Sequence, residues 1–197
     1  MIHIENITKS FSGKTILDGI SGVFEQGKTN LIIGASGTGK SVLLKCIVGL
    51  VRPDTGTVRY NDRDFTHGDK DLKTEIRREI GMLFQGVALF DSLNVENNVK
   101  FPLDTLTDTP EDEKLDRVNF CLKRVGLEGS NKKLPSELGG GMQKRVGIAR
   151  AIVNDVKYLF CDEPNSGLDP QTSVLIDDLN KEITEELGTT TIVVTHD

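Results

Sequence analysis

Gly34-Ala35-Ser36-Gly37-Thr38-Gly39-Lys40-Ser41 decides the fold of this 197-residue chain. The stretch matches the GxxxxGK[ST] pattern, and it lies between a short apolar run at residues 29–33 and a predicted helix at residues 41–50. The glycines let successive backbone N–H groups curl around phosphate oxygens, and the following helix presents its positive end to them. Lys40 is expected to reach the β- and γ-phosphates of a nucleotide, and the Ser41 hydroxyl to ligate Mg²⁺.

The same stretch disfavours a nicotinamide-binding fold. The dinucleotide pattern GxGxxG would need glycine at position 36 or 42, where the chain has Ser36 and Val42. We therefore expect a nucleotide site lined by residues of the loop and the start of the helix: Gly34, Ser36, Gly37, Thr38, Gly39, Lys40, Ser41 and Val42.

The rest of the sequence predicts strands that alternate with helices. Apolar runs at residues 79–84, 157–161 and 190–194 lack clean alternation, which is typical of parallel strands buried on both faces. Apolar residues recur at helical spacing in two places, at Leu115, Val118, Leu122 and Val125, and at Leu175, Leu179, Ile183 and Leu187. This pattern indicates a mostly parallel α/β sheet covered by helices on both faces.

Two segments depart from that alternation. The first thirty residues predict short strands with a hairpin turn at residues 12–14. Residues from about 86 to 155 contain no convincing strand, so we expect them to form an inserted helical lobe.

Two acidic residues follow the apolar run at residues 158–161. Because the C-terminal end of a strand in such a sheet lies beside the phosphate loop, Asp162 is expected to hold Mg²⁺, directly or through water. Glu163 follows where the chain turns and is expected to accept a proton from an attacking water. An Asp-Glu pair can also be a solvated strand end, but the phosphate loop upstream favours the catalytic interpretation.

Composition excludes several classes of protein. Lys and Arg number 24 against 30 Asp and Glu, and the resulting charge of −6 argues against bulk binding of nucleic acid. No stretch approaches the roughly 20 uncharged apolar residues that a membrane span needs, and the first residues do not resemble a secretory signal. Cys46, Cys121 and Cys161 are far apart without metal-type spacing, which suits a reducing cytosol.

Four further elements narrow the class of nucleotide-binding protein. Gln85 follows an apolar run, residues 137–145 (ELGGGMQKR) open a predicted helix, residues 166–169 (SGLD) follow the acidic pair, and His196 follows the last predicted strand. In order and spacing, the motifs resemble the ATP-binding cassette of ABC transporters over essentially the whole chain. The resemblance implies a P-loop NTPase with a RecA-like, mostly parallel sheet core, an N-terminal antiparallel β subdomain and an inserted α-helical subdomain.

The resemblance also implies catalytic roles. Gln85 is expected to sense Mg²⁺ and to link the site to a membrane partner, and His196 is expected to contact the γ-phosphate. Glu163 and Lys40 complete the expected catalytic set. Phe11 stands where the family keeps an aromatic side chain that stacks on adenine.

A second subunit is expected to complete the site. The signature loop of the family corresponds to Gly139, Gly140, Gly141 and Met142, and it faces the γ-phosphate of the opposite subunit in a head-to-tail homodimer. Asp169 corresponds to the acid at the dimer seam. The expected cofactors are ATP and Mg²⁺.

The signature departs from the usual pattern. It normally reads Leu-Ser-Gly-Gly followed by Gln, whereas residues 138–142 read Leu-Gly-Gly-Gly-Met. The absent serine hydroxyl would donate a hydrogen bond to the γ-phosphate, and such a bond to a charged group is worth roughly 1.5–3 kcal/mol. We therefore expect weaker ATP-driven dimerisation and slower turnover than in the serine version.

Two segments, residues 83–95 and 137–145, are similar to the ATPases of Mla-type lipid-asymmetry systems, and relatives in lipid-transport systems also carry Met at position 142. The expected function is therefore to energise lipid or phospholipid transport across the cell envelope. A coupling helix of transmembrane permease subunits is expected near residues 85–101. The alternatives are import of amino acids or other small solutes, a soluble ABC ATPase acting on ribosomes, Fe–S assembly or DNA, and a weakly hydrolysing nucleotide-binding module.

We expect one domain over residues 1–197, with residues 1–85 and 156–197 forming the catalytic core and β subdomain and residues 86–155 the helical signature lobe. Cassettes normally continue past the switch histidine, so the C-terminal part is expected to be missing. The expected location is cytoplasmic, on the inner face of the cell membrane. There the chain is expected to meet the membrane only through its protein partner and to bind no nucleic acid.

Overall fold

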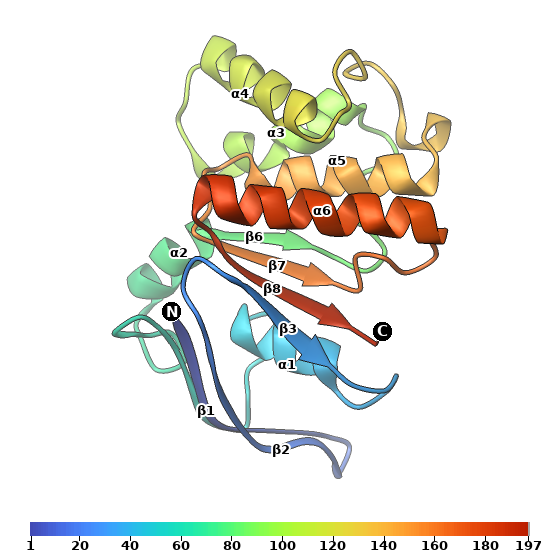
Figure 1. Ribbon diagram of the computed structural model, residues 1–197. Coiled ribbons are helices and arrows are strands. Elements are labelled where there is room, and N and C mark those ends of the chain that lie inside the picture. Colours follow the sequence, from blue (N-terminus) through green and yellow to red (C-terminus); the bar gives the residue numbers. More distant parts are fainter. Residues whose placement is uncertain (197) are drawn as a thin grey trace.

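The computed structural model describes residues 1–196, which form two four-stranded sheets and a group of helices (Figure 1). The antiparallel sheet has the order β2-β1-β4-β5, and the parallel sheet has the order β3-β8-β7-β6. The strands of the first sheet are β1 (Ile2–Phe11), β2 (Lys14–Phe24), β4 (Thr55–Tyr60) and β5 (Arg63–Asp64). Those of the second are β3 (Thr29–Ile33), β6 (Ile80–Leu83), β7 (Tyr158–Asp162) and β8 (Thr190–Thr195).

The central strands β7 and β8 of the parallel sheet are buried on both faces because their alternate side chains enter two different cores. In the edge strand β3, Leu31 and Ile33 are 57% and 62% exposed. Leu159 and Cys161 of β7 pack with the helices above the sheet, whereas Tyr158 and Phe160 pack with the elements below it. All five residues of β7 are buried. The prediction of a mostly parallel sheet covered on both faces is thus confirmed, and double-sided burial explains the missing alternation.

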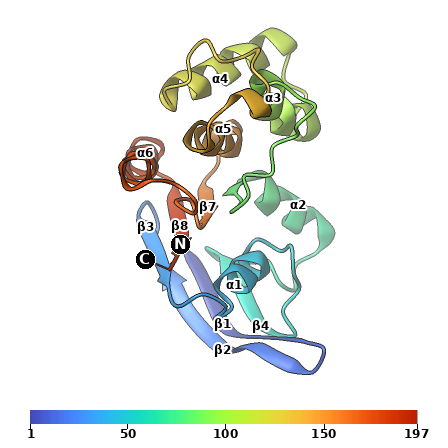
Figure 2. The ribbon, with the colours of Figure 1, turned by 90° about the vertical axis from the view of Figure 1, so that its right-hand side faces the viewer.

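Helices cover both faces of the parallel sheet, one group on each core (Figures 1 and 2). The upper face carries α5 (Gly140–Ile152) and α6 (Pro170–Leu187), and the lower face carries α1 (Lys40–Ile47). The lower core also takes side chains from the antiparallel sheet, such as Ile2 and Tyr60, so one apolar cluster joins the two sheets.

The predicted helix after the phosphate loop ends slightly earlier than expected. Val48 is the C-cap, and Gly49 follows with φ +76. The N–H of Leu50 bonds to the carbonyl of Lys45 and that of Gly49 to the carbonyl of Cys46, which is the Schellman ending that a glycine permits.

Helices occupy most of the chain between β6 and β7. They are α3 (Val95–Leu106), α4 (Glu111–Arg124), a short 3₁₀ turn (Pro135–Glu137) and α5, and no strand occurs in residues 86–155. Buried side chains of α3, α4 and α5 share the core above the sheet. A further helix, α2 (Lys70–Arg78), precedes β6 and was not anticipated from the sequence, nor were β4 and β5. Across residues 1–196, no helix combines the length and apolar character needed to cross a membrane.

Candidate functional site

The phosphate loop, residues 34–41, lies at the edge of the molecule where the parallel strands end (Figure 1). Its backbone requires glycine at two points, since Gly37 has φ +79 and Gly39 has φ +95. A Cβ on Gly39 would also lie 3.0 Å from Ile16 Cγ2 and 3.1 Å from the carbonyl oxygen of Ile16. The loop therefore packs closely on β2 at Gly39.

Two side chains at the start of α1 point into the site. Lys40 Nζ donates to the carbonyl oxygens of Gly34 and Ala35, at 2.7 and 3.0 Å. Ser41 Oγ donates to Asp162 Oδ1 at 2.8 Å, although the two residues are 121 positions apart. A hydroxyl and a carboxylate side by side are hard oxygen donors of the kind that Mg²⁺ prefers, so these residues fit that ion.

The acidic pair lies at the end of β7. Asp162 is the last residue of the strand and is 5% exposed, and Glu163 follows with φ +49 as the chain turns. Glu163 Oε1 lies 3.9 Å from Lys40 Nζ, and Glu163 Oε2 lies 2.6 Å from His196 Nδ1. The structure thus brings Lys40, Glu163 and His196 together beside the phosphate loop.

A cavity of about 390 Å³ lies over Lys40 and Glu163, whereas Asp162 and His196 do not line it. Phe11 at the end of β1 is 45% exposed and forms one wall, and Gln85, just after β6, forms another. The residues around the cavity are Phe11, Ile16, Ser36, Gly37, Gly39, Lys40, Ser41, Val42, Gln85 and Glu163. Gly34 and Thr38 belong to the loop but do not line the cavity. Ile16 was missed, because only the packing of the phosphate loop on β2 brings it to the site.

The signature loop, residues 139–142, lies at the start of α5, on the same edge of the molecule but above the sheet (Figure 1). Gly139 is the exposed N-cap of α5, and Met142 packs partly against the core. A Cβ on Gly141 would lie 2.5 Å from Thr172 Cγ2, so the start of α5 touches the start of α6. These residues do not line the cavity of their own chain.

Asp169 caps helix α6. Its carboxylate accepts hydrogen bonds from the backbone N–H groups of Gln171 and Thr172 and from the Thr172 hydroxyl, and these bonds lower its pKa. The residue therefore has a structural function at a helix N-terminus, beside the signature loop.

Lys144 is the main site-adjacent residue that sequence reasoning missed. Its side chain is buried, and its Nζ donates to the carbonyl oxygen of Gln85 at 2.6 Å. Burial lowers the pKa of Lys144, while the charges of Asp162 and Glu163 act in the opposite direction. No sequence signal distinguishes this lysine from the neighbouring basic residue Arg145.

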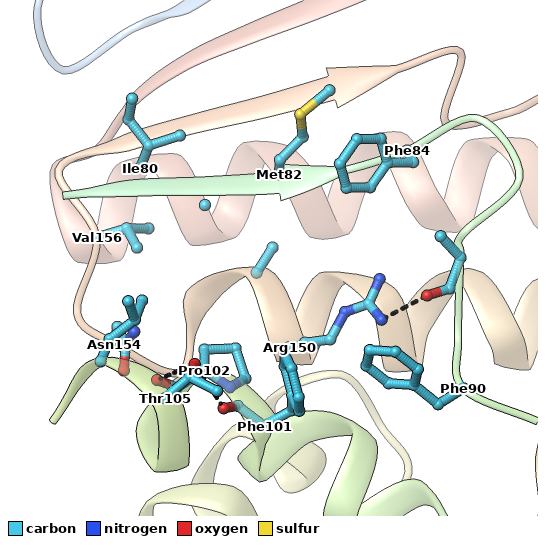
Figure 3. A pocket seen from close by; sticks show the side chains of 14 residues that line it. Ile80, Met82, Phe84, Phe90, Phe101, Pro102, Thr105, Arg150, Asn154 and Val156 are labelled. Carbon is cyan, nitrogen blue, oxygen red and sulfur yellow. Dashed lines mark hydrogen bonds between the residues drawn. The ribbon is translucent and has the colours of Figure 1, made fainter. Parts of the chain in front are cut away.

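A second, larger cavity of about 460 Å³ lies between β6 and the helices above it (Figure 3). Its walls are mainly apolar, and the guanidinium of Arg150 lies between Phe84 and Phe90. Phe90 and Phe101 are 41% and 40% exposed, with ring centroids 4.8 Å apart. The lining residues are Ile80, Gly81, Met82, Phe84, Ala88, Phe90, Phe101, Pro102, Thr105, Leu106, Arg150, Ala151, Asn154 and Val156.

Comparison with known proteins agrees with this geometry. A family model described as "ABC transporter" matches residues 17–166. The probable ribonucleotide transport ATP-binding protein mkl of Mycobacterium leprae is 40% identical over 99% of the chain, and the methionine import ATP-binding protein MetN of Halalkalibacterium halodurans is 41% identical over all of it. The chain spans 56% and 59% of the lengths of these two relatives.

Solved structures resemble the whole chain. The dimeric structure of MJ0796, a bacterial ABC transporter cassette, superimposes with a TM-score of 0.90 at 36% identity, covering 100% of this chain and 88% of that one. A dimeric post-hydrolysis state of the same cassette, bound to ADP and Pi, gives a TM-score of 0.89 at 35% identity and covers the same shares of the two chains.

Proposed function

The chain belongs to the ABC transporter family of ATP-binding domains, and from this premise we propose that it hydrolyses ATP to energise a membrane transporter. The observation that carries the proposal is the position of Glu163, whose carboxylate lies between Lys40 and His196 beside the phosphate loop. A domain that only bound nucleotide would have no need of a carboxylate there.

Binding of ATP relies on groups at the ends of β3 and β7. The backbone N–H groups of the phosphate loop and the N-terminus of α1 hold the phosphates, and Lys40 exchanges its bonds to Gly34 and Ala35 for phosphate oxygens. Phe11 stacks on the adenine ring. Ser41, Asp162 and Gln85 hold Mg²⁺, which neutralises phosphate charge when bound.

Hydrolysis relies on positioning and charge neutralisation more than on covalent chemistry. Glu163 orients a water molecule and accepts its proton, and His196, bonded to the same carboxylate, holds the side chain and contacts the γ-phosphate. Lys40 stabilises the charge that develops on the transferred phosphoryl group.

In the proposed mechanism, the signature loop of a second copy of the chain supplies the remaining hydrogen-bond donors to the γ-phosphate. Gly139, Gly140, Gly141 and Met142 lie at the exposed start of α5, away from the cavity of their own chain, as a loop that serves a partner would. We therefore propose a head-to-tail homodimer with two ATP molecules at the seam, with Asp169 beside the signature loop. A lone subunit is then a weak ATPase.

Substitution of the base tests this mechanism. Glu163→Gln keeps the shape of the side chain but cannot accept the proton. ATP binding should remain, hydrolysis should fall by roughly 10²–10⁴-fold, the usual contribution of a general base, and size-exclusion chromatography with MgATP should show a trapped dimer. Hydrolysis at the unsubstituted rate would contradict Glu163 as the base, and loss of ATP binding would point to damage at the loop.

We further propose that the cavity in Figure 3 receives a helix of a transmembrane permease. The cavity is apolar, opens between the segment after β6 and the helical lobe, and is bordered by residues near Gln85, so a helix seated there would contact the loop that also lines the ATP site. The chain would then be a cytoplasmic subunit on the inner face of the membrane, touching it through the permease and binding no nucleic acid.

For the transported molecule we propose lipid or phospholipid. The support is the similarity of residues 83–95 and 137–145 to Mla-type ATPases. Import of a small solute is the alternative, because the names of the relatives refer to ribonucleotide and methionine transport. Affinity purification from detergent-solubilised membranes, followed by identification of the co-purified permease and ATPase assays with phospholipid or amino acid, separates the two. Stimulation by amino acid alone would contradict lipid transport.

A further inference from the structure

One face of helix α5 packs against the segment that follows β6 and donates hydrogen bonds to it. Lys144, Gly147 and Arg150 are spaced by three residues and lie on that face. A Cβ on Gly147 would lie 2.6 Å from both Leu83 Cδ1 and Val87 Cγ1, so the glycine allows the helix to approach the segment closely.

The basic residues at the ends of this face hold backbone carbonyls of the segment. Lys144 Nζ donates to the carbonyl of Gln85 at 2.6 Å, and Arg150 donates to those of Val87 and Ala88 at 2.5 and 2.8 Å. Val87 and Ala88 have φ +59 and +53, a left-handed conformation that non-glycine residues adopt only when their surroundings impose it. The segment is therefore held in place by α5.

Lys144 also contacts the backbone of Glu163 and the side chain of Ser166. Its Nζ lies 3.4 Å from the carbonyl oxygen of Glu163 and 3.5 Å from Ser166 Oγ. Only 4% of Lys144 is exposed, and among the ion pairs of residues 1–196 none involves it. A buried ammonium group is costly unless it is hydrogen-bonded, so these three oxygen atoms account for its burial.

We infer that Lys144 is a positioning residue for ATP hydrolysis, because one ammonium group ties the backbone of Gln85 to that of Glu163 and so sets the separation of their side chains across the ATP site. The inference rests on the proposed function. Lys144 does not line the cavity, so its effect on the reaction passes through Gln85 and Glu163. It belongs to α5, so this tie also links the helix that begins with the signature loop to both residues.

The inference predicts that substitution of Lys144 lowers kcat but leaves KM for ATP nearly unchanged. Lys144→Met keeps the length of the side chain and removes its three donors. The phosphate loop and Phe11 are untouched, so KM for ATP should stay within about twofold, whereas kcat should fall at least about tenfold, since small misplacements of reacting groups are costly. Lys144→Arg retains charged donors and should recover part of kcat.

Arg145→Met is the matched control. Arg145 is the next residue of α5 and donates to the carbonyls of Val125 and Gly126, at 3.2 and 3.3 Å, inside the helical lobe. This variant removes the same kind of bond from the same helix without touching the site, so kcat should not change. Thermal unfolding of all variants, with and without MgATP, separates loss of stability from loss of positioning.

Several results would overturn the inference: an unchanged kcat in Lys144→Met, an equal fall in Arg145→Met, or no recovery in Lys144→Arg. If Lys144→Met fails to fold, Lys144→Gln replaces it, and failure of every Lys144 variant to fold would make the residue a determinant of stability alone. Glu163→Gln, assayed in parallel, reports on the proposed function separately. If it abolishes hydrolysis while Lys144→Met does not reduce kcat, only the role of Lys144 is wrong.

Discussion

Gly139 begins α5 with φ −66 and ψ 160, a backbone conformation that serine adopts readily and that suits an N-cap. No atom outside its chain neighbours lies within 4 Å of a Cβ built at this position. The glycine is therefore not required by packing, and the missing hydroxyl can be restored without strain. At the scale of the residue, the departure from the usual signature concerns the chemistry of the loop and not its shape.

Gly139→Ser should raise the ATPase rate. The added hydroxyl supplies the hydrogen bond to the γ-phosphate across the dimer, which is worth roughly 1.5–3 kcal/mol, and it should also strengthen dimerisation with ATP. Helix capping should add only a few tenths of a kcal/mol to stability. Steady-state ATPase assays and size-exclusion chromatography with MgATP measure both effects. Gly139→Ala, which adds the Cβ alone, is the control, and an unchanged rate in the serine variant would refute the prediction.

At the scale of the elements, Glu79 connects the two sheets. It directly precedes β6, and its carboxylate accepts from Arg63 Nη2 of β5 at 2.6 Å and from Lys157 Nζ, next to β7, at 2.7 Å. Burial acts to raise the pKa of Glu79, but the hydrogen bonds and charges of Arg63 and Lys157 outweigh it, so the pKa lies below the usual value. Ionised Glu79 therefore stabilises the fold.

Glu79→Gln should lower the free energy of unfolding by about 1–2 kcal/mol near pH 7, because a charged hydrogen bond is weakened in a largely buried place. A lowered folded-state pKa adds stability above the unfolded pKa of about 4.3, and that stability is lost as the pH falls through the folded value. The difference between variant and parent should therefore shrink below about pH 4. Urea titrations at several pH values measure it.

Glu75→Gln is the control for that series. Glu75 Oε1 also lies 3.0 Å from Arg63 Nη1, but its side chain is 63% exposed, so the change should cost little. A difference between Glu79→Gln and the parent that stays constant from pH 3 to pH 7 would contradict the assigned charge interaction.

Helix α6 illustrates what periodicity misses at this scale. The sequence correctly predicts a helix here, but the stripe from Leu175 to Leu187 is wrong at its ends, because Leu175 is 64% exposed and Leu187 is 36% exposed. The buried face instead contains Ile176 and two polar residues, Asn180 and Thr184. A count of apolar residues cannot identify a face that also buries polar side chains.

At the scale of the whole molecule, the exposed aromatic side chains around the larger cavity allow a test of the proposed docking of the permease. Phe101 borders that cavity, whereas Phe120 on α4 is 51% exposed and lies elsewhere. Phe101→Glu should reduce co-purification of the permease several-fold and leave ATP binding by the separate subunit intact, because it places a charge in an apolar docking surface.

Phe120→Glu is the matched control for assembly and should retain the permease. Quantitative pull-down from membranes that contain both subunits measures the comparison. Equal retention in the two variants would show that the permease docks on another surface, without affecting the assignment of the ATP site.

Much of the site could be predicted because its chemistry is local in the sequence. The phosphate loop needs closely spaced glycines and a helix start, and the acidic pair needs a strand end, so short patterns predicted Lys40, Ser41, Asp162 and Glu163 as a set, and the structure places them close together. The helical lobe was predicted from the lack of strands. The antiparallel strand β4 was not, because its pairing with β1 depends on partners some fifty residues away. Strand β5, which pairs with β4, contains two residues, too few to give a periodic pattern.

The sequence by itself therefore determined the class of fold, the phosphate loop and the motifs that identify the family, because each depends on neighbouring residues or on their periodicity. Only the tertiary structure decided which face of α6 is buried, that Ile16 supports Gly39, and that Lys144 joins Gln85 to Glu163. The physical reason is that these contacts join residues from separate elements. A hydrogen bond between a lysine and a distant carbonyl depends on how a helix packs on a sheet, which no local pattern encodes.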